Sequence, residues 1–201
     1  MSKGDAKKQL ILDRGLRVMQ SHGYNGTSVK DIVEAAGVPK GSFYNYFESK
    51  EAFALDAIDQ VASQNIREMT RILSNKSKSA KSRVSEFFEE NINGCCVNQF
   101  KIGCFLGNMS QEMSDSSEPI RIKLEMVMNT ITEHLASAIS QMKADGELDH
   151  IRDPESLAQF LINSWHGSML RMKTDSRRQP LDVFMTHLNE LFDGGVAAHT
   201  N

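Results

Sequence analysis

The chain has 201 residues, a formal net charge of −3 and 40% hydrophobic residues, as expected for a folded protein of one large or two small domains. Stretches without a charge fall well short of the roughly 20 apolar residues that a membrane span needs, and the N-terminus lacks the apolar segment of a secretory signal. Three cysteines, two of them adjacent, make no disulfide framework. These features predict a cytoplasmic protein without a membrane partner.

Charge is distributed unevenly along the chain. Residues 1–50 contain eight basic and five acidic side chains, whereas the remainder contains fifteen basic and twenty-one acidic ones. A basic N-terminal part on an acidic body indicates that only the N-terminal part meets a polyanion such as DNA.

Apolar residues recur at helical spacing through nearly the whole chain, and no segment alternates as a strand does. The sequence therefore predicts an all-α fold. The first helix is expected to end at residue 22. Further helices are expected over residues 29–36, 40–47, 50–73, 82–98, 104–113, 118–143, 154–173 and 181–192.

Two of these segments, 29–36 and 40–47, have the pattern of short helices joined by a tight turn. Thr27 or Ser28 is placed to cap the first, and Gly37 is placed to end it. Small residues at the turn allow the two helices to cross closely.

The second short helix carries an unusual polar face. Phe43 and Phe47 are spaced to enter the core, which leaves a face formed by Lys40, Ser42, Tyr44, Asn45 and Tyr46. Such side chains hydrogen-bond phosphates and base edges in a major groove. Gly41 permits close approach of a phosphate, and Lys50 supplies a point charge for the DNA backbone. The alternative from these residues alone is a helical corner without a DNA-binding role.

Residues 10–55 resemble the N-terminal domain of TetR-family transcriptional regulators. The matching residues are Gly23-Tyr24, Thr27-Ser28-Val29, Asp31-Ile32, Ala35-Ala36-Gly37-Val38, Gly41, Phe43-Tyr44, Tyr46-Phe47 and Lys50-Glu51. The resemblance implies a three-helix helix-turn-helix DNA-binding domain over 1–50 and a helical ligand-binding and dimerisation domain over 51–201. It also implies that 40–47 is the recognition helix, that Thr27 or Ser28 touches phosphate, and that Tyr46 and Lys50 grip the backbone of double-stranded operator DNA.

A second resemblance concerns residues 103–108 and 111–114, which are similar to the subgroup of the N-ethylmaleimide-reductase repressor and the acrylate-utilisation regulator. It implies that Cys104 senses electrophiles or oxidants. The residues themselves agree, because a thiol at a helix N-terminus, with Lys101 near in sequence, has a lowered pKa. The alternative is that Cys104 is a small buried hydrophobe; Cys95 and Cys96 are expected to fill the core.

Eleven methionines suit a cavity that adapts to a small ligand, although ordinary core packing is the favoured explanation for any single one. The residues assigned to the ligand or sensor site are Cys104, Phe105, Asn108, Met109, Trp165 and Met169. His166 has no second ligand at metal-binding spacing, so no metal and no cofactor are expected.

A single short recognition helix reads only a few base pairs, so a homodimer on a palindromic operator is expected. The resemblance to the TetR family implies that helices 154–173 and 180–193 form the interface. The prediction is a regulator, by family default a repressor, that a small-molecule or electrophile inducer releases. The alternatives are a noncovalent ligand-responsive regulator without a cysteine role and an adaptor that has lost DNA binding. An enzyme with a cysteine nucleophile is disfavoured, because the chain has no catalytic or phosphate-loop motif.

Overall fold

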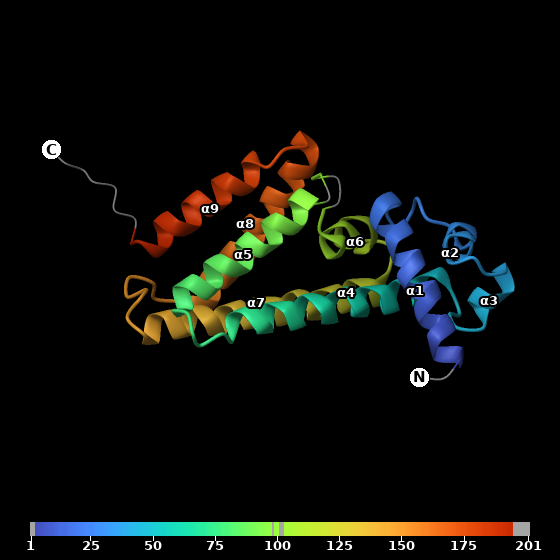
Figure 1. The fold of residues 1–201 in the computed structure, drawn as a ribbon, viewed down its shortest axis with the longest axis horizontal. Helices are drawn as coiled ribbons and strands as arrows, with labels where there is room; N and C mark the ends of the chain where they lie inside the picture. The colour runs from blue at the N-terminus through green and yellow to red at the C-terminus, as the bar shows by residue number, and fades with distance from the viewer. Residues whose placement is uncertain (1–2, 98, 101–102, 195–201) are drawn as a thin grey trace. The chain divides into compact units, whose positions relative to one another are not determined.

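The computed structural model describes residues 3–97, 99–100 and 103–194, and in these residues the chain forms nine α-helices and no strand (Figure 1). The predicted all-α class is thus confirmed. In chain order the helices are α1 (Lys3–His22), α2 (Val29–Ala36), α3 (Lys40–Tyr44), α4 (Lys50–Leu73), α5 (Ala80–Val97), α6 (Phe105–Met113), α7 (Glu118–Ala144), α8 (Pro154–Asp175) and α9 (Gln179–Phe192). No helix within the described ranges is long and apolar enough to cross a membrane.

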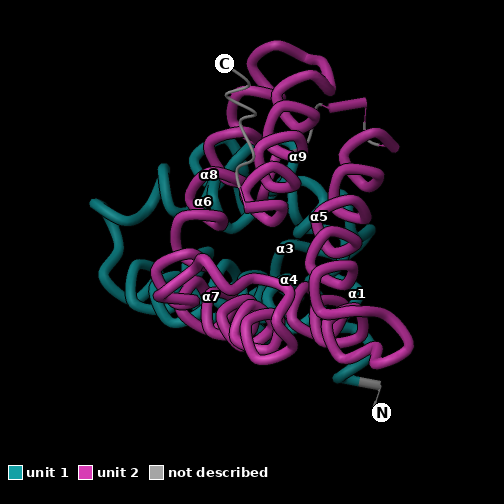
Figure 2. The backbone as a smooth tube through the Cα atoms, turned by 90° about the vertical axis from the view of Figure 1, so that its left-hand side faces the viewer, with its two compact units in different colours: residues 1–64, 105–127 teal, residues 65–104, 128–201 magenta. Residues whose placement is uncertain are grey.

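The chain divides by packing into two compact units, residues 1–64 with 105–127 and residues 65–104 with 128–201 (Figure 2). Helices α4 and α7 each contribute to both units. The boundary between these units therefore differs from the domain boundary predicted after residue 50. The predicted boundary separates functions, DNA binding from ligand binding, and it stays a prediction.

The first unit has an aromatic core beneath the two short helices. Phe43, Phe47 and Phe53 are all buried, and their ring centroids lie 5.1–5.9 Å apart. Helix α1 comes close to this core at Gly15, where an added Cβ would lie 2.6 Å from Ile32 and from Phe53. Burial of each aromatic ring contributes about 1.5–3 kcal/mol, so this cluster fixes α2 and α3 on α1 and α4.

The turn between α2 and α3 is built by a left-handed glycine. Gly37 has φ of 65°, and its N–H donates to Glu34 O at 3.1 Å while Val38 N–H donates to Val33 O at 3.0 Å. Glycine adopts this conformation without steric cost. The predicted end of the 29–36 helix is thus confirmed.

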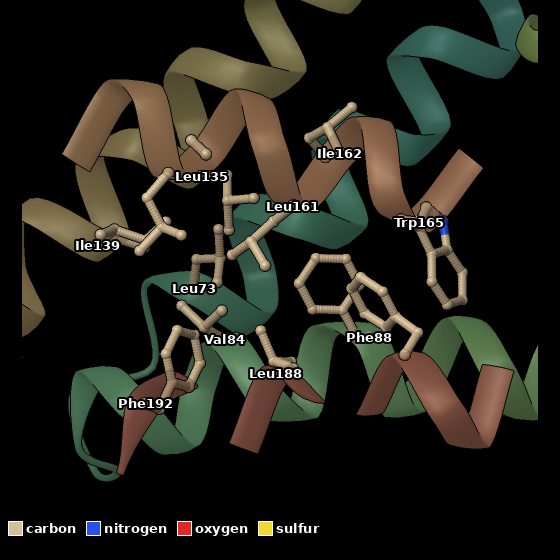
Figure 3. Packing of buried hydrophobic residues seen from close by; sticks show 14 of the residues in the cluster. Leu73, Val84, Phe88, Leu135, Ile139, Leu161, Ile162, Trp165, Leu188 and Phe192 are labelled. Atoms are coloured by element: carbon tan, nitrogen blue, oxygen red, sulfur yellow. The ribbon is translucent and has the colours of Figure 1, made fainter. Parts of the chain in front are cut away.

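The second unit packs α5, α8 and α9 together with the adjoining parts of α4 and α7. Its core contains Phe88, Trp165 and Phe184, whose ring centroids lie 4.8–5.5 Å apart. Figure 3 shows Phe88 and Trp165 side by side, with aliphatic side chains such as Leu161 filling the space beyond them. Helix α8 begins where the sequence predicts, because Asp153 accepts hydrogen bonds from the backbone N–H groups of the first turn.

Candidate nucleic-acid interface and sensor region

Helix α3 presents the polar face that the sequence predicts. Lys40, Gly41, Tyr44 and Asn45 are exposed, and Tyr44 retains 54% of its accessible surface. The ring of Tyr44 stands edge-on to buried Phe43, at 5.3 Å between centroids, which limits its orientation. These side chains offer one cation and several hydrogen-bonding groups on one surface.

Gly41 leaves open space on α3, and Ser42 and Tyr46 border its exposed face. A Cβ added at Gly41 would meet no atom within 4 Å, so the chain itself does not require glycine there. The open space is available to an approaching backbone or phosphate. Ser42 and Tyr46 are half-buried at the edge of the face.

Helix α3 is shorter than predicted, ending at Tyr44 instead of Phe47. The carbonyl of Phe43 accepts the N–H groups of both Tyr46 and Phe47 at 3.0 Å, so the chain turns tightly after Tyr44. This turn directs Phe47 into the core. A helix of five residues is not stable by itself, and burial of Phe43 holds it in place.

Of the two predicted caps of α2, Ser28 is the one that the structure uses. The Ser28 side chain accepts from Asp31 N–H at 3.2 Å, and Asp31 accepts from Ser28 N–H at 2.8 Å and from the Ser28 hydroxyl at 2.7 Å. These bonds form a capping box and lower the pKa of Asp31. Thr27 is buried, and its hydroxyl donates to Gly23 O at 2.7 Å.

Lys50 is half-buried and directed toward the loop between α1 and α2. Its ammonium donates to the carbonyls of Tyr24 and Thr27, both at 3.0 Å, and lies 4.0 Å from the centre of the Tyr24 ring. Burial lowers the pKa of Lys50, and the carboxylate of Glu112 opposes that shift. Lys50 therefore orders the loop, and a contact with DNA remains a prediction.

Glu112 also contacts this loop, and the sequence analysis did not single it out. Its carboxylate accepts the N–H of Asn25 at 3.0 Å. The two residues are 87 positions apart, and no local pattern joins α6 to the loop. Only the folded chain reveals the pair.

The residues assigned to the sensor site fall in both units. Phe105 and Met109 are buried and Asn108 is half-buried on α6, whereas Trp165 and Met169 are buried in the core of the second unit. Residues of an ordinary core are buried in the same way whether or not they bind a ligand, so the ligand role of these residues stays a prediction.

Cys104 is half-buried, directly precedes α6 and packs against the core of the second unit. Its place before a helix N-terminus agrees with the prediction, whereas Lys101 lies outside the described residues. All three cysteines are in the described chain, and none forms a disulfide.

The adjacent cysteines have different environments. Burial raises the pKa of Cys95 to about 11, so this thiol stays protonated at neutral pH. Cys96 is half-buried, so it is more accessible than Cys95. The sequence treats both as core residues.

Two surface hollows lie beside α9 among the described residues of the second unit. One of about 580 Å³ lies against α8 and α9 and is mainly apolar, with Phe160, Leu161, Val183 and Leu188 among its lining residues. The other, of about 400 Å³, lies between α5 and α9 and is lined mainly by polar residues. His166 is half-buried, and burial lowers its pKa. Among the side chains that the structure describes, no group of three or more His, Cys, Asp or Glu residues is arranged to hold a metal ion.

Family models match both parts of the chain. The model for bacterial regulatory proteins of the tetR family matches residues 11–57, and the model for the tetracyclin repressor-like C-terminal domain matches residues 80–188. The chain belongs to the TetR family.

The TetR-family relatives are transcriptional regulators. HTH-type transcriptional repressor DhaR of Mycobacterium sp. (strain GP1) is 36% identical over 89% of this chain and 88% of its own length. Transcriptional regulator AcuR of Cereibacter sphaeroides is 32% identical over 88% of this chain and 80% of its own length. The crystal structure of Escherichia coli NemR in its reduced form has a TM-score of 0.84 and 25% identity, covering 92% of this chain and 96% of that one. This TetR-family chain is therefore a DNA-binding transcriptional regulator and not an enzyme, as predicted.

Proposed function

We propose that this TetR-family chain binds a palindromic operator as a homodimer, represses transcription in the cytoplasm, and leaves DNA when an inducer acts on it. The observation that carries the DNA-binding part is the exposed face of α3, with Lys40, Tyr44 and Asn45 in solvent beside buried Phe43. In this proposal Tyr44 and Asn45 contact base edges or phosphates, Lys40 contacts phosphate, and Gly41 admits the DNA backbone.

The residues around α3 divide into direct and supporting roles. Ser28 and Tyr46 contact phosphate at the edges of the interface, with Ser42 between them. Thr27 and Lys50 hold the preceding loop through their bonds to backbone carbonyls, and Lys50 adds a positive charge beneath the phosphates.

Dimerisation through α8 and α9 is supported by the apolar surface of these helices. Phe160 and Val183 retain 57% and 44% of their accessible surface and line the apolar hollow on that face. Two copies related by a two-fold axis would each bury the same surface. Phe160→Glu is expected to convert a dimer to a monomer in sedimentation velocity, whereas Gln159→Glu, the same charge at an exposed neighbouring position, leaves a dimer.

The inducer, we infer, is an electrophile that adds to the thiolate of Cys104. In this reaction the sulfur forms a bond to the β-carbon of an unsaturated carbonyl, the carbon–carbon π bond breaks, and water protonates the resulting enolate. Cys96 is a second candidate because it is only half-buried, whereas the raised pKa of buried Cys95 makes that thiol unreactive at neutral pH. The alternative is a ligand that binds noncovalently.

N-ethylmaleimide tests these alternatives, with operator binding followed by fluorescence anisotropy. Release of the wild type but not of Cys104→Ser supports Cys104 as the sensor. Release of Cys104→Ser but not of Cys96→Ser transfers the role to Cys96, and Cys95→Ser is the control expected to behave as the wild type. No release in any of the four proteins refutes a thiol sensor and leaves the noncovalent alternative.

A further inference from the structure

The loop between α1 and α2 is held by two charged side chains of the first unit. Lys50 donates to the carbonyls of Tyr24 and Thr27. The carboxylate of Glu112 accepts the N–H of Asn25 at 3.0 Å. The backbone groups of a short loop therefore depend on two side chains that come from α4 and α6.

Gly23 makes room for the carboxylate. A Cβ at this position would lie 2.3 Å from one Glu112 oxygen and 2.9 Å from its carboxyl carbon, closer than real atoms approach. Gly23 also has φ of +75°, which L side chains rarely adopt. The side chain of Glu112 thus occupies the space that any other residue at 23 would fill.

The charge of Glu112 also suits its neighbour Lys50. Both side chains are half-buried, and the carboxylate acts against the loss of charge that burial imposes on the ammonium. Removing the carboxylate would leave Asn25 N–H without this acceptor and Lys50 without this counter-charge. Hydrogen bonds to charged groups are stronger than neutral ones.

Glu112 lies in the last turn of α6, a helix of nine residues that starts directly after Cys104. At 1.5 Å per residue, α6 is about 13 Å long. The buried residues Phe105, Leu106, Met109 and Met113 fix its position, and with it the position of Glu112. The loop held by Glu112 leads directly into Ser28, the cap of α2.

We propose that Glu112 is a positioning residue through which α6 holds the loop of residues 23–27, and with it the start of α2, in the arrangement that binds DNA. The proposal rests on the proposed function and adds to it a named contact between α6 and the DNA-binding helices. Without the bond from Asn25 to Glu112, the loop gains freedom and operator affinity falls.

Glu112→Ala, Glu112→Gln and the control Glu125→Ala test the proposal in the full-length protein. Glu125 is exposed on α7 of the same unit, where it accepts a hydrogen bond from Arg121. Glu125→Ala therefore removes one negative charge, as Glu112→Ala does, but at a different position. Amide hydrogen exchange of Asn25 is measured first, without DNA. We expect exchange about tenfold faster in Glu112→Ala and less change in Glu112→Gln, which keeps an acceptor oxygen.

Operator affinity is measured next for the same proteins, after circular dichroism establishes that each retains its helices. Glu112→Ala should bind about tenfold more weakly, Glu112→Gln should lie between it and the wild type, and Glu125→Ala should match the wild type. Equal binding by Glu112→Ala and wild type would overturn the positioning role. Failure of the wild type to bind operator would instead overturn the proposed function, and Asn25 exchange would still decide whether Glu112 holds the loop.

A double-mutant cycle with Gly23→Ala tests the steric part separately. In the wild-type background the new methyl group displaces the carboxylate and imposes backbone strain, whereas in Glu112→Ala only the strain remains. Gly23→Ala should therefore cost less operator affinity in the Glu112→Ala background. Equal costs in the two backgrounds would show that Glu112 and Gly23 act independently and would refute the contact.

Discussion

Replacing Lys40 by alanine gives a quantitative test of where the DNA backbone runs. Lys40 is the first residue of α3 and is exposed, so its truncation leaves the buried core and the helix intact. A protein releases counterions from DNA for each phosphate that it neutralises, and the slope of log K against log salt changes by about 0.9 per contact. Two copies of Lys40 in a dimer thus account for about 1.8 of the slope.

This slope has a direct consequence for affinity. Between 50 and 200 mM salt, a slope difference of about 1.8 makes the wild type lose about 12-fold more affinity than Lys40→Ala does. Fluorescence anisotropy titrations at four or five salt concentrations measure both slopes. Lys76→Ala is the control, because Lys76 is exposed in the loop between α4 and α5 and carries the same charge. Equal slopes for Lys40→Ala and wild type would refute a phosphate contact at Lys40.

Three further predictions concern stability. Ser28→Ala removes the cap of α2 and should lower the free energy of unfolding by about 1 kcal/mol in urea titrations; no loss would refute the capping box. The lowered pKa of folded Asp31 stabilises the protein above its unfolded pKa of about 3.9, and this contribution is lost as the pH falls through the folded pKa. Thermal melts from pH 6 to pH 3 should therefore depend less on pH in Asp31→Asn than in the wild type. Phe88→Ala should cost about 3–5 kcal/mol by urea titration, because the ring is fully buried, and a cost below about 1 kcal/mol would contradict that packing.

The sequence predicts most of the local structure because local features determine it. Helical periodicity, the glycine at position 37 and the aspartate at 153 set where helices run and end, and the structure agrees at each. The error at the end of α3 has a local cause that the pattern does not contain. Phe47 keeps the helical bond from its N–H to the carbonyl of Phe43, but the N–H of Tyr46 donates to the same carbonyl and tightens the last turn.

The candidate site was predicted less completely, because part of it depends on contacts between distant segments. The exposed residues of α3 follow from helical spacing, so Tyr44 and Asn45 were predicted. The inward direction of Lys50 follows from carbonyls more than 20 residues away. The contact of Glu112 with Asn25 depends on tertiary packing, which no spacing rule describes.

The central claim is that the exposed face of α3 reads operator DNA, and competition binding tests it most directly. Labelled palindromic operator is titrated with wild type and with Tyr44→Ala, in parallel with a duplex of shuffled sequence, after sedimentation shows the same oligomeric state for both proteins. We expect the wild type to prefer the operator by at least about 1,000-fold and Tyr44→Ala to lose much of that preference while keeping its helices. An unchanged preference in Tyr44→Ala would contradict the assignment of this face.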